Sequence, residues 1–390
     1  MKRLLFTLLT IATMAISAMS QHATRFPLHP IEADSIYFMD FFWHTMQQKA
    51  LDTPITTTPA TPWEVKKASA SHIAKMAHQW ATATAHLNIQ GEPSASPANL
   101  KESLQIFSQS YSLNQLTGQA RYLDLAEHLL VNSIIPLWHS EANPTIKDCA
   151  TMLLRTISQM AYSTSGHDIY VNMPMRANAH IKTQDLNIFL RSVNSSPWYN
   201  ETAITIAANN NAVDIADYDS INQYQKLVQH AQTDTIAPCR AAIHLRIPLW
   251  AKASTPLTGF SASTSRRPMV RVLVNGIAQS HPDTLGGYIV IDRTWHVGDI
   301  ITIHMPTPIV RLTDPQHPDS IALQRGPFVY SFVGTEPTDS LSRNLTVGQT
   351  FSKPDNAVVL SGMIKNSDNR FFAIPLYQAT EKKKIFMPAK

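Results

Sequence analysis

The sequence has little of the chemistry that marks a metal or redox protein. Only two cysteines, Cys149 and Cys239, occur in its 390 residues, and two thiolates alone cannot complete a zinc site of the four-cysteine kind. The sixteen histidines form no HxxxH or HExxH pair, so no local histidine metal motif is present either. The two cysteines could pair with each other, but they lie in segments that we assign to different domains, which disfavours a disulfide.

Strong charge and long apolar runs are also scarce. The formal net charge is +4, and the one dense basic run is 382–384, next to the C-terminus, so we predict no nucleic-acid partner. No stretch beyond residue 20 is apolar and long enough to span a bilayer, so we predict no membrane span. The hydrophobic content of 44% is ordinary for a globular chain and is enough for a packed core.

The first twenty residues read MKRLLFTLLTIATMAISAMS, with two cations, an apolar run and then small residues ahead of Gln21. This order is typical of a secretory signal peptide, and it is too short for a membrane anchor. No cysteine lies near the expected cleavage site that could carry a lipid. We therefore predict a mature protein that is exported, either secreted or periplasmic.

Apolar residues at helical spacing predict that residues 21–165 form about five helices, with the linker TPITTTPATP between the first two. The predicted helices are Ser35–Lys49, Glu64–Ala85, one that begins near Lys101, one that precedes Pro136, and Lys147–Tyr162.

At Gly166 the period of the apolar residues changes from 3.6 to 2, which predicts a domain boundary followed by strands. The segments HLRIPLW, VRVLVNG and GGYIVIDRTWHVGDIITIHMP alternate in polarity and are separated by glycine turns. Antiparallel strands with one apolar face need a second sheet to cover that face. We therefore predict an α+β multidomain chain, with an antiparallel β-sandwich over 166–313, a smaller β domain over 314–390, and a long surface excursion between 209 and 237.

These strand motifs resemble a known family. HLRIPLW, VNG, GGYIVIDRTWHVGDIITIHMP, IALQRGPFVY and FFAIPLY are similar, in this order, to the β-domain motifs of glycoside hydrolase family 127, the β-L-arabinofuranosidases. The helical segments 101–133 and 148–173 resemble parts of the same family. The resemblance implies an (α/α)6-type barrel that holds the active site, followed by β-sandwich domains. Most of the first barrel helices have no counterpart here, so we expect a partial barrel.

The resemblance also implies a site. Family members hold zinc with one Glu and three Cys, use one thiolate as nucleophile, and use a separate Glu as acid/base. Carried over, the metal-binding Glu falls on Glu102 and the Cys that follows it falls on Leu104. The Cys-Cys pair falls on Asp148 and Cys149, which leaves the zinc site incomplete. One hypothesis is that Asp148 replaces the thiolate as nucleophile, with Glu92 of QGEP as acid/base.

Each of these residues also has a structural interpretation. Asp148 is expected as the N-cap of the helix that follows it, Glu102 as a first-turn glutamate that faces the helix dipole, and Glu92 as an exposed loop carboxylate. Cys149 is expected to be a small apolar residue of the core. Three tryptophans of the β half could stack on sugars but are expected in the core: Trp198, Trp250 and Trp295.

Two functions follow from the resemblance. The first is an exported glycoside hydrolase that removes terminal L-arabinofuranosides. The second is a non-catalytic relative, a β-sandwich module that binds a glycan or a partner protein. The carbohydrate partner that the resemblance implies is an L-arabinose-containing glycan. A third interpretation, a damaged helical half that folds poorly, also remains open. A homodimer is a separate expectation, formed through the flank of the barrel that the missing helices leave uncovered.

Overall fold

The structure is a computed structural model. It describes residues 26–59, 65–90, 99–194, 196–208, 237–264, 268–279, 284–314, 317–336, 339–342, 345–352, 357–379 and 384–389. The predicted signal peptide, residues 1–20, and most of the predicted excursion lie outside this range. None of the helices in the described part of the chain is long and apolar enough to cross a membrane.

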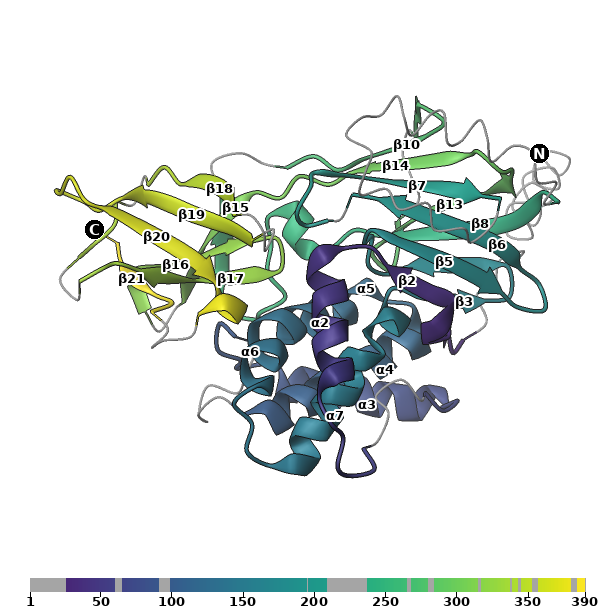
Figure 1. The fold of residues 1–390 in the computed structure, drawn as a ribbon, viewed down its shortest axis with the longest axis horizontal. Coiled ribbons are helices and arrows are strands. Elements are labelled where there is room, and N and C mark those ends of the chain that lie inside the picture. The colour runs from purple at the N-terminus through teal and green to yellow at the C-terminus, as the bar shows by residue number, and fades with distance from the viewer. Residues whose placement is uncertain are drawn as a thin grey trace, which may run out of the picture.

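The helices gather on one side of the molecule, below the sheets in Figure 1. They are α2 (Phe41–Asp52), α3 (Ala70–Ala83), α4 (Leu100–Thr117), α5 (Ala120–Leu129), α6 (Ile135–Trp138) and α7 (Pro144–Arg155). A π-helical turn, Leu130–Ile134, joins α5 to α6, so the helix does not stop before Pro136 as predicted. The described helices are fewer than the six helix pairs of an (α/α)6 barrel, so they establish a helical layer and do not establish a barrel.

Most strands of the first two sheets come from the middle of the chain. In the six-stranded sheet the order is β1 (His29–Pro30), β3 (Tyr162–Ser165), β4 (Asp168–Val171), β8 (Cys239–Arg246), β13 (Tyr288–Trp295) and β12 (Thr284–Leu285). In the seven-stranded sheet it is β11 (Ile277–Ala278), β10 (Arg271–Val274), β14 (Ile300–His304), β7 (Glu201–Ala207), β6 (Asn187–Val193), β5 (Ala177–Lys182) and β2 (Ile36–Phe38).

The C-terminal sheet lies to the left in Figure 1, away from the first two. Its order is β18 (Gly348–Ser352), β19 (Ala357–Met363), β20 (Arg370–Pro375), β17 (Phe328–Val333), β16 (His317–Arg325), β15 (Ile309–Asp314) and β9 (Ser261–Ser263), and β21 (Met387–Pro388) pairs with β16. Among the described strands, the ladders are antiparallel as predicted, with the exception of the parallel pair β4 and β8. One continuous apolar core runs through the helices and the sheets, so the helical half is packed rather than loose.

The first predicted helix, Ser35–Lys49, is wrong at its start. Residues Ile36–Phe38 form β2, which pairs with β5 through Ile36 and Ala179. Ile36 and Phe38 are buried while Tyr37 is 54% exposed, which is the two-residue period of a strand at a sheet edge. The helix begins only after Asp40, whose carboxylate accepts a hydrogen bond from the Trp43 backbone N–H at 3.0 Å.

Two other predicted helices are too long. The second begins at Ala70, after its cap Ser69, and not at Glu64. The last runs Pro144–Arg155 and not Lys147–Tyr162, because Asn143 caps its start and Tyr162 already belongs to β3. Pro144 at the first helical position lacks the N–H that would have no partner there, so it favours this earlier start.

Candidate functional site

Asp148 lies in the second turn of α7 and is 3% exposed. Its Oδ2 accepts four hydrogen bonds: from the backbone N–H groups of Thr56 (2.8 Å) and Thr57 (2.7 Å), and from the Thr57 (2.9 Å) and Thr56 (3.1 Å) hydroxyls. Both threonines belong to the segment that follows α2. The carboxylate therefore ties this segment to α7, which makes it a structural anchor.

A second residue of α7 holds the same segment from its other end. Arg155 donates from Nε to the Ala50 carbonyl (2.9 Å) and from Nη2 to the Leu51 (3.3 Å) and Thr53 (2.5 Å) carbonyls. Ala50 and Leu51 stand in the last turn of α2 and Thr53 is its C-cap, where carbonyls lack the partner that they would have inside a helix. Asp148 and Arg155 thus hold the C-terminal end of α2 and the segment after it. Asp148 accepts from the N–H groups there, and Arg155 donates to the C=O groups.

These contacts also set the charge of Asp148. Burial by itself would raise the pKa of Asp148, but the hydrogen bonds from Thr56 and Thr57 hold that pKa below its ordinary value. The group is therefore an ionised carboxylate with one oxygen fully engaged. Its expected role as an N-cap is wrong, because Asn143 caps α7 through the Ile146 N–H at 3.3 Å.

Glu102 occupies the first turn of α4, as its structural interpretation requires. It is half-buried, and its Oε2 is a buried atom without a hydrogen-bond partner in the described structure. The neighbouring Ser103 hydroxyl lies 2.6 Å from the Ser133 hydroxyl, which ties the start of α4 to the π-helical turn.

The residues present do not fit the zinc site that the resemblance implies. Leu104 is a partly buried apolar residue packed against the core and offers no ligand atom. Cys149 is a half-buried free thiol, and Cys239 is also free. Across the described residues, no three His, Cys, Asp or Glu side chains lie close enough to hold a metal ion, so Glu102, Asp148 and Cys149 do not form such a group. Glu92 lies outside the described residues.

The motifs that carry the resemblance meet instead at a buried ion network between α5 and β8. Arg246 of HLRIPLW donates from Nη2 to Asp124 Oδ1 (2.7 Å) and Glu127 Oε2 (2.8 Å), and from Nη1 to the Asn172 carbonyl (3.1 Å). The Trp250 indole N–H also donates to Glu127 Oε2 at 3.1 Å. The network joins the helical layer to the six-stranded sheet.

All three ionic side chains of this network are almost fully withdrawn from water. Burial raises the pKa of Glu127, and the positive charge of the Arg246 guanidinium offsets part of this rise. Burial alone would lower the pKa of Arg246, but the two carboxylates raise it, so the guanidinium stays charged. Because it compensates two buried carboxylates at once, we assign Arg246 an architectural role.

A second junction joins the helices to the C-terminal sheet. Asn132, in the π-helical turn, donates from Nδ2 to the Pro327 carbonyl and accepts from the Val329 N–H, both at 2.8 Å. Nearby, the Phe42 ring of α2 packs on Trp198 and Phe328, with centroids 5.5 and 5.8 Å apart. The three predicted core tryptophans, Trp198, Trp250 and Trp295, are indeed buried.

Sequence reasoning found the motifs but missed what they contact. Thr56 and Thr57 were assigned only to a linker, and nothing in TPITTTPATP marks them as partners of Asp148. Asp124 and Glu127 stand three residues apart on a predicted helix, so they share one face of it. This face lies opposite the apolar stripe of Tyr122, Leu125 and Ala126, so the sequence alone would place both acids toward solvent, and it gives no signal of the buried Arg246 that they contact.

Comparison with known proteins agrees with this architecture. Residues 168–307 match the family model described as Beta-L-arabinofuranosidase, GH127 middle domain, so the predicted resemblance is confirmed and the chain is a GH127-like protein. No curated protein sequence matches the chain.

Solved structures extend the similarity in fold beyond the middle domain. A GH127 β-arabinofuranosidase superposes with a TM-score of 0.65 at 17% identity, over 80% of this chain and 55% of its own. A GH127 β-L-arabinofuranosidase from Geobacillus stearothermophilus T6 gives a TM-score of 0.59 at 17% identity, over 80% of this chain and 56% of its own. The chain therefore spans about half the length of these structures and shares the fold of that half.

Proposed function

We propose that the protein is an exported, non-catalytic relative of the β-L-arabinofuranosidases that binds L-arabinose-containing glycans. The GH127-like middle domain supports a carbohydrate ligand. The observation that carries the non-catalytic part is the environment of Asp148, at the position where the resemblance places the nucleophilic thiolate.

A nucleophile must reach the anomeric carbon of its substrate. Asp148 is covered by the segment that contains Thr56 and Thr57, and four donors share its Oδ2. Each of these contacts stabilises the carboxylate as an anion and lowers its nucleophilicity. Leu104 stands at a second changed position of the family's zinc site, and its side chain supplies no ligand atom. The chain therefore lacks the ligands that would hold zinc beside a nucleophile.

What the chain keeps from the family supports the same proposal. The YLDLAE and HLRIPLW motifs make the Arg246 network, and QRGPFVY supplies the backbone groups that Asn132 binds. These motifs hold the parts of the molecule together. A binding protein needs this scaffold without the hydrolytic site.

One observation favours a second candidate, hydrolysis of terminal L-arabinofuranosides. Glu102 is retained at the metal position, and its Oε2 is buried without a partner in the described structure. An orphaned buried carboxylate oxygen is unfavourable unless a proton, an ion or a substrate group binds it.

Calorimetric titration with an arabino-oligosaccharide, followed by chromatography of the same sample for free L-arabinose, separates the two candidates. We expect binding heat and no released sugar. Release of L-arabinose that Glu102→Gln abolishes would establish the hydrolase. Neither heat nor release from a folded protein would refute both candidates.

Export and assembly need their own measurements. We expect the protein recovered from the periplasm or medium to begin at Gln21, which intact-mass analysis shows directly. The predicted homodimer would appear in a sedimentation run as a species of twice the monomer mass, and a monomer at all concentrations would contradict it.

A further inference from the structure

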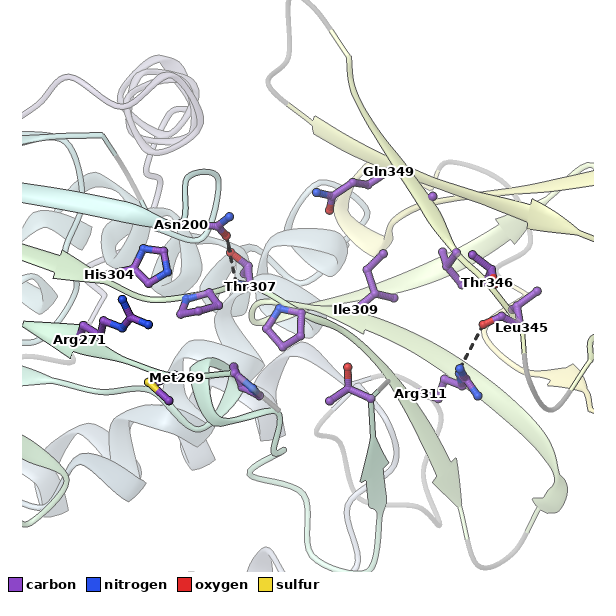
Figure 2. Close-up of a pocket in the computed structure, with 16 residues that line it drawn as sticks. Asn200, Met269, Arg271, His304, Thr307, Ile309, Arg311, Leu345, Thr346 and Gln349 are labelled. Carbon is purple, nitrogen blue, oxygen red and sulfur yellow. Dashed lines mark hydrogen bonds between the residues drawn. The ribbon is translucent and has the colours of Figure 1, made fainter. Parts of the chain in front are cut away.

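A groove lies between the seven-stranded sheet, which contains β10 and β14, and the C-terminal sheet (Figure 2). Its volume is about 990 Å³, and its floor is the linker 306–308 between β14 and β15. Arg271 of β10 and His304 of β14 line one side, and residues 345–349 at the start of β18 line the other. This volume lies at the upper end for small-molecule sites and suits a short oligosaccharide.

The groove is held open by polar contacts beneath it. The Asn200 Oδ1 accepts from the Thr307 N–H (3.2 Å) and hydroxyl (3.1 Å), which fixes the floor. The Gln349 Oε1 accepts from Arg325 Nε at 2.8 Å, and Arg325 Nη1 donates to the Pro197 carbonyl at 3.0 Å. Buried Arg325 therefore connects the wall that contains Gln349 to the segment 197–200 that holds the floor, so a ligand would meet a preformed surface.

The lining carries two positive charges, those of Arg271 and Arg311, and none of the described lining residues is acidic. Arg271 and His304 stand opposite each other on neighbouring strands, so their side chains share one face, as Figure 2 shows. The nearest acid in that row of side chains is Glu201 of β7. It stands opposite His304 in the sheet and does not line the groove.

The apolar part of the lining consists of prolines and aliphatic side chains. Met269 is 63% exposed there, and Pro306 and Pro308 form part of the floor. None of the described lining residues is Phe, Tyr or Trp, so the groove lacks the large rings that usually stack on the face of a neutral sugar. Hydrogen bonds and the two arginine cations are therefore the main polar means of recognition in this groove.

We propose that this groove binds an acidic oligosaccharide, one whose sugar units carry carboxylates as uronic acids do, with Arg271 as the principal contact to a carboxylate. The guanidinium is the side chain best suited to a planar carboxylate, since it donates two parallel hydrogen bonds. This inference rests on the proposed glycan-binding function and specifies the kind of sugar.

Titration calorimetry at low salt tests the inference, with hexagalacturonate as the acidic probe and a neutral arabino-oligosaccharide beside it. We expect wild-type protein to bind hexagalacturonate and the affinity to fall as sodium chloride is added. Arg271→Gln should weaken binding of the acidic probe by about tenfold or more, because a charge-assisted contact is lost. Arg240→Gln is the matched control, since Arg240 is 56% exposed and does not line the groove.

The two ligands separate the inference from the function on which it rests. Unchanged hexagalacturonate affinity in Arg271→Gln would overturn the inference. So would a wild-type protein that binds the neutral probe alone, and the proposed function would then stand. Failure of both probes would refute both proposals. Equal melting temperatures for the two variants would show that folding is unaffected.

Discussion

Replacement of Arg246 by methionine leaves two carboxylates buried without their cation. The Arg246 side chain is 0% exposed, and those of Asp124 and Glu127 are 6% and 7% exposed. The variant loses three hydrogen bonds, to Asp124, Glu127 and the Asn172 carbonyl. Removal of one partner from a buried ion network costs about 3–5 kcal/mol, a large part of the about 5–15 kcal/mol that stabilises a typical protein.

The matched control lies on the same strand. Arg240 is 56% exposed and pairs with Asp292 at 2.8 Å. Because water screens this pair, Arg240→Met should lower the free energy of unfolding by no more than about 1 kcal/mol. A triple variant, Arg246→Met with Asp124→Asn and Glu127→Gln, removes the uncompensated charges and should recover much of the stability lost in Arg246→Met.

The deficit of Arg246→Met should also depend on pH. Burial raises the pKa of Glu127 in the folded protein, and loss of Arg246 raises it further. A carboxyl whose folded pKa is raised disfavours folding once it ionises, so the deficit should shrink as the pH falls below the folded pKa of Glu127. Urea unfolding at pH 8 and pH 5 measures this. Equal losses in Arg246→Met and Arg240→Met at both pH values would refute the role assigned to the network.

Three further variants test separate parts of the structure. Asp148→Asn should speed amide hydrogen exchange at Thr56 and Thr57, whereas the control Asp185→Asn, at an exposed site, should not. Since the folded pKa of Asp148 is lowered, wild-type protein should lose the contribution of this carboxylate as the pH falls below the ordinary value of 3.8, and the variant should show no such loss. Gly326→Ala should cost about 2–4 kcal/mol, because its Cβ would lie 2.6 Å from the Pro197 Cβ at a φ of +59°. Gly334→Ala, at a φ of +66° with no atom within 4 Å, should cost only about 1–2 kcal/mol, and equal losses in urea unfolding would contradict the steric argument. Burial lowers the pKa of His128 to about 4 from 6.5, so folded wild-type protein should lose about 2 kcal/mol relative to His128→Gln between pH 7 and pH 5. Parallel stability curves for wild type and His128→Gln would contradict that assignment, and His296→Gln, at a 59% exposed site, is the control.

The features that could be predicted from the sequence are local ones. VRVLVNG and the run from Gly286 to Pro306 form β10, β13 and β14, because alternation and glycine turns fix strands without information from elsewhere in the chain. The helical stripe around Leu125 and Leu129 likewise forms α5. The end of the last helix was missed, because Tyr162 keeps an apolar period while its backbone joins a hairpin with β4.

The features that could not be predicted depend on partners distant in sequence. Ile36 and Phe38 fit either a helix or a strand, and pairing with β5, about 140 residues away, decides between them. Asp148 lies 92 residues from Thr56, so its four hydrogen bonds leave no trace in the local pattern. An Asp near the start of a helix is favoured as a cap, and this preference made the wrong assignment the natural one.

The measurement that tests the account most directly is turnover of p-nitrophenyl β-L-arabinofuranoside by the mature protein, with and without added zinc, beside Asp148→Ala. If Asp148 is an anchor and the zinc site is incomplete, wild-type protein should release no p-nitrophenol above background in either condition, while it still binds arabino-oligosaccharide. Turnover by wild-type protein that is lost in a folded Asp148→Ala variant would contradict the account and make this carboxylate the nucleophile.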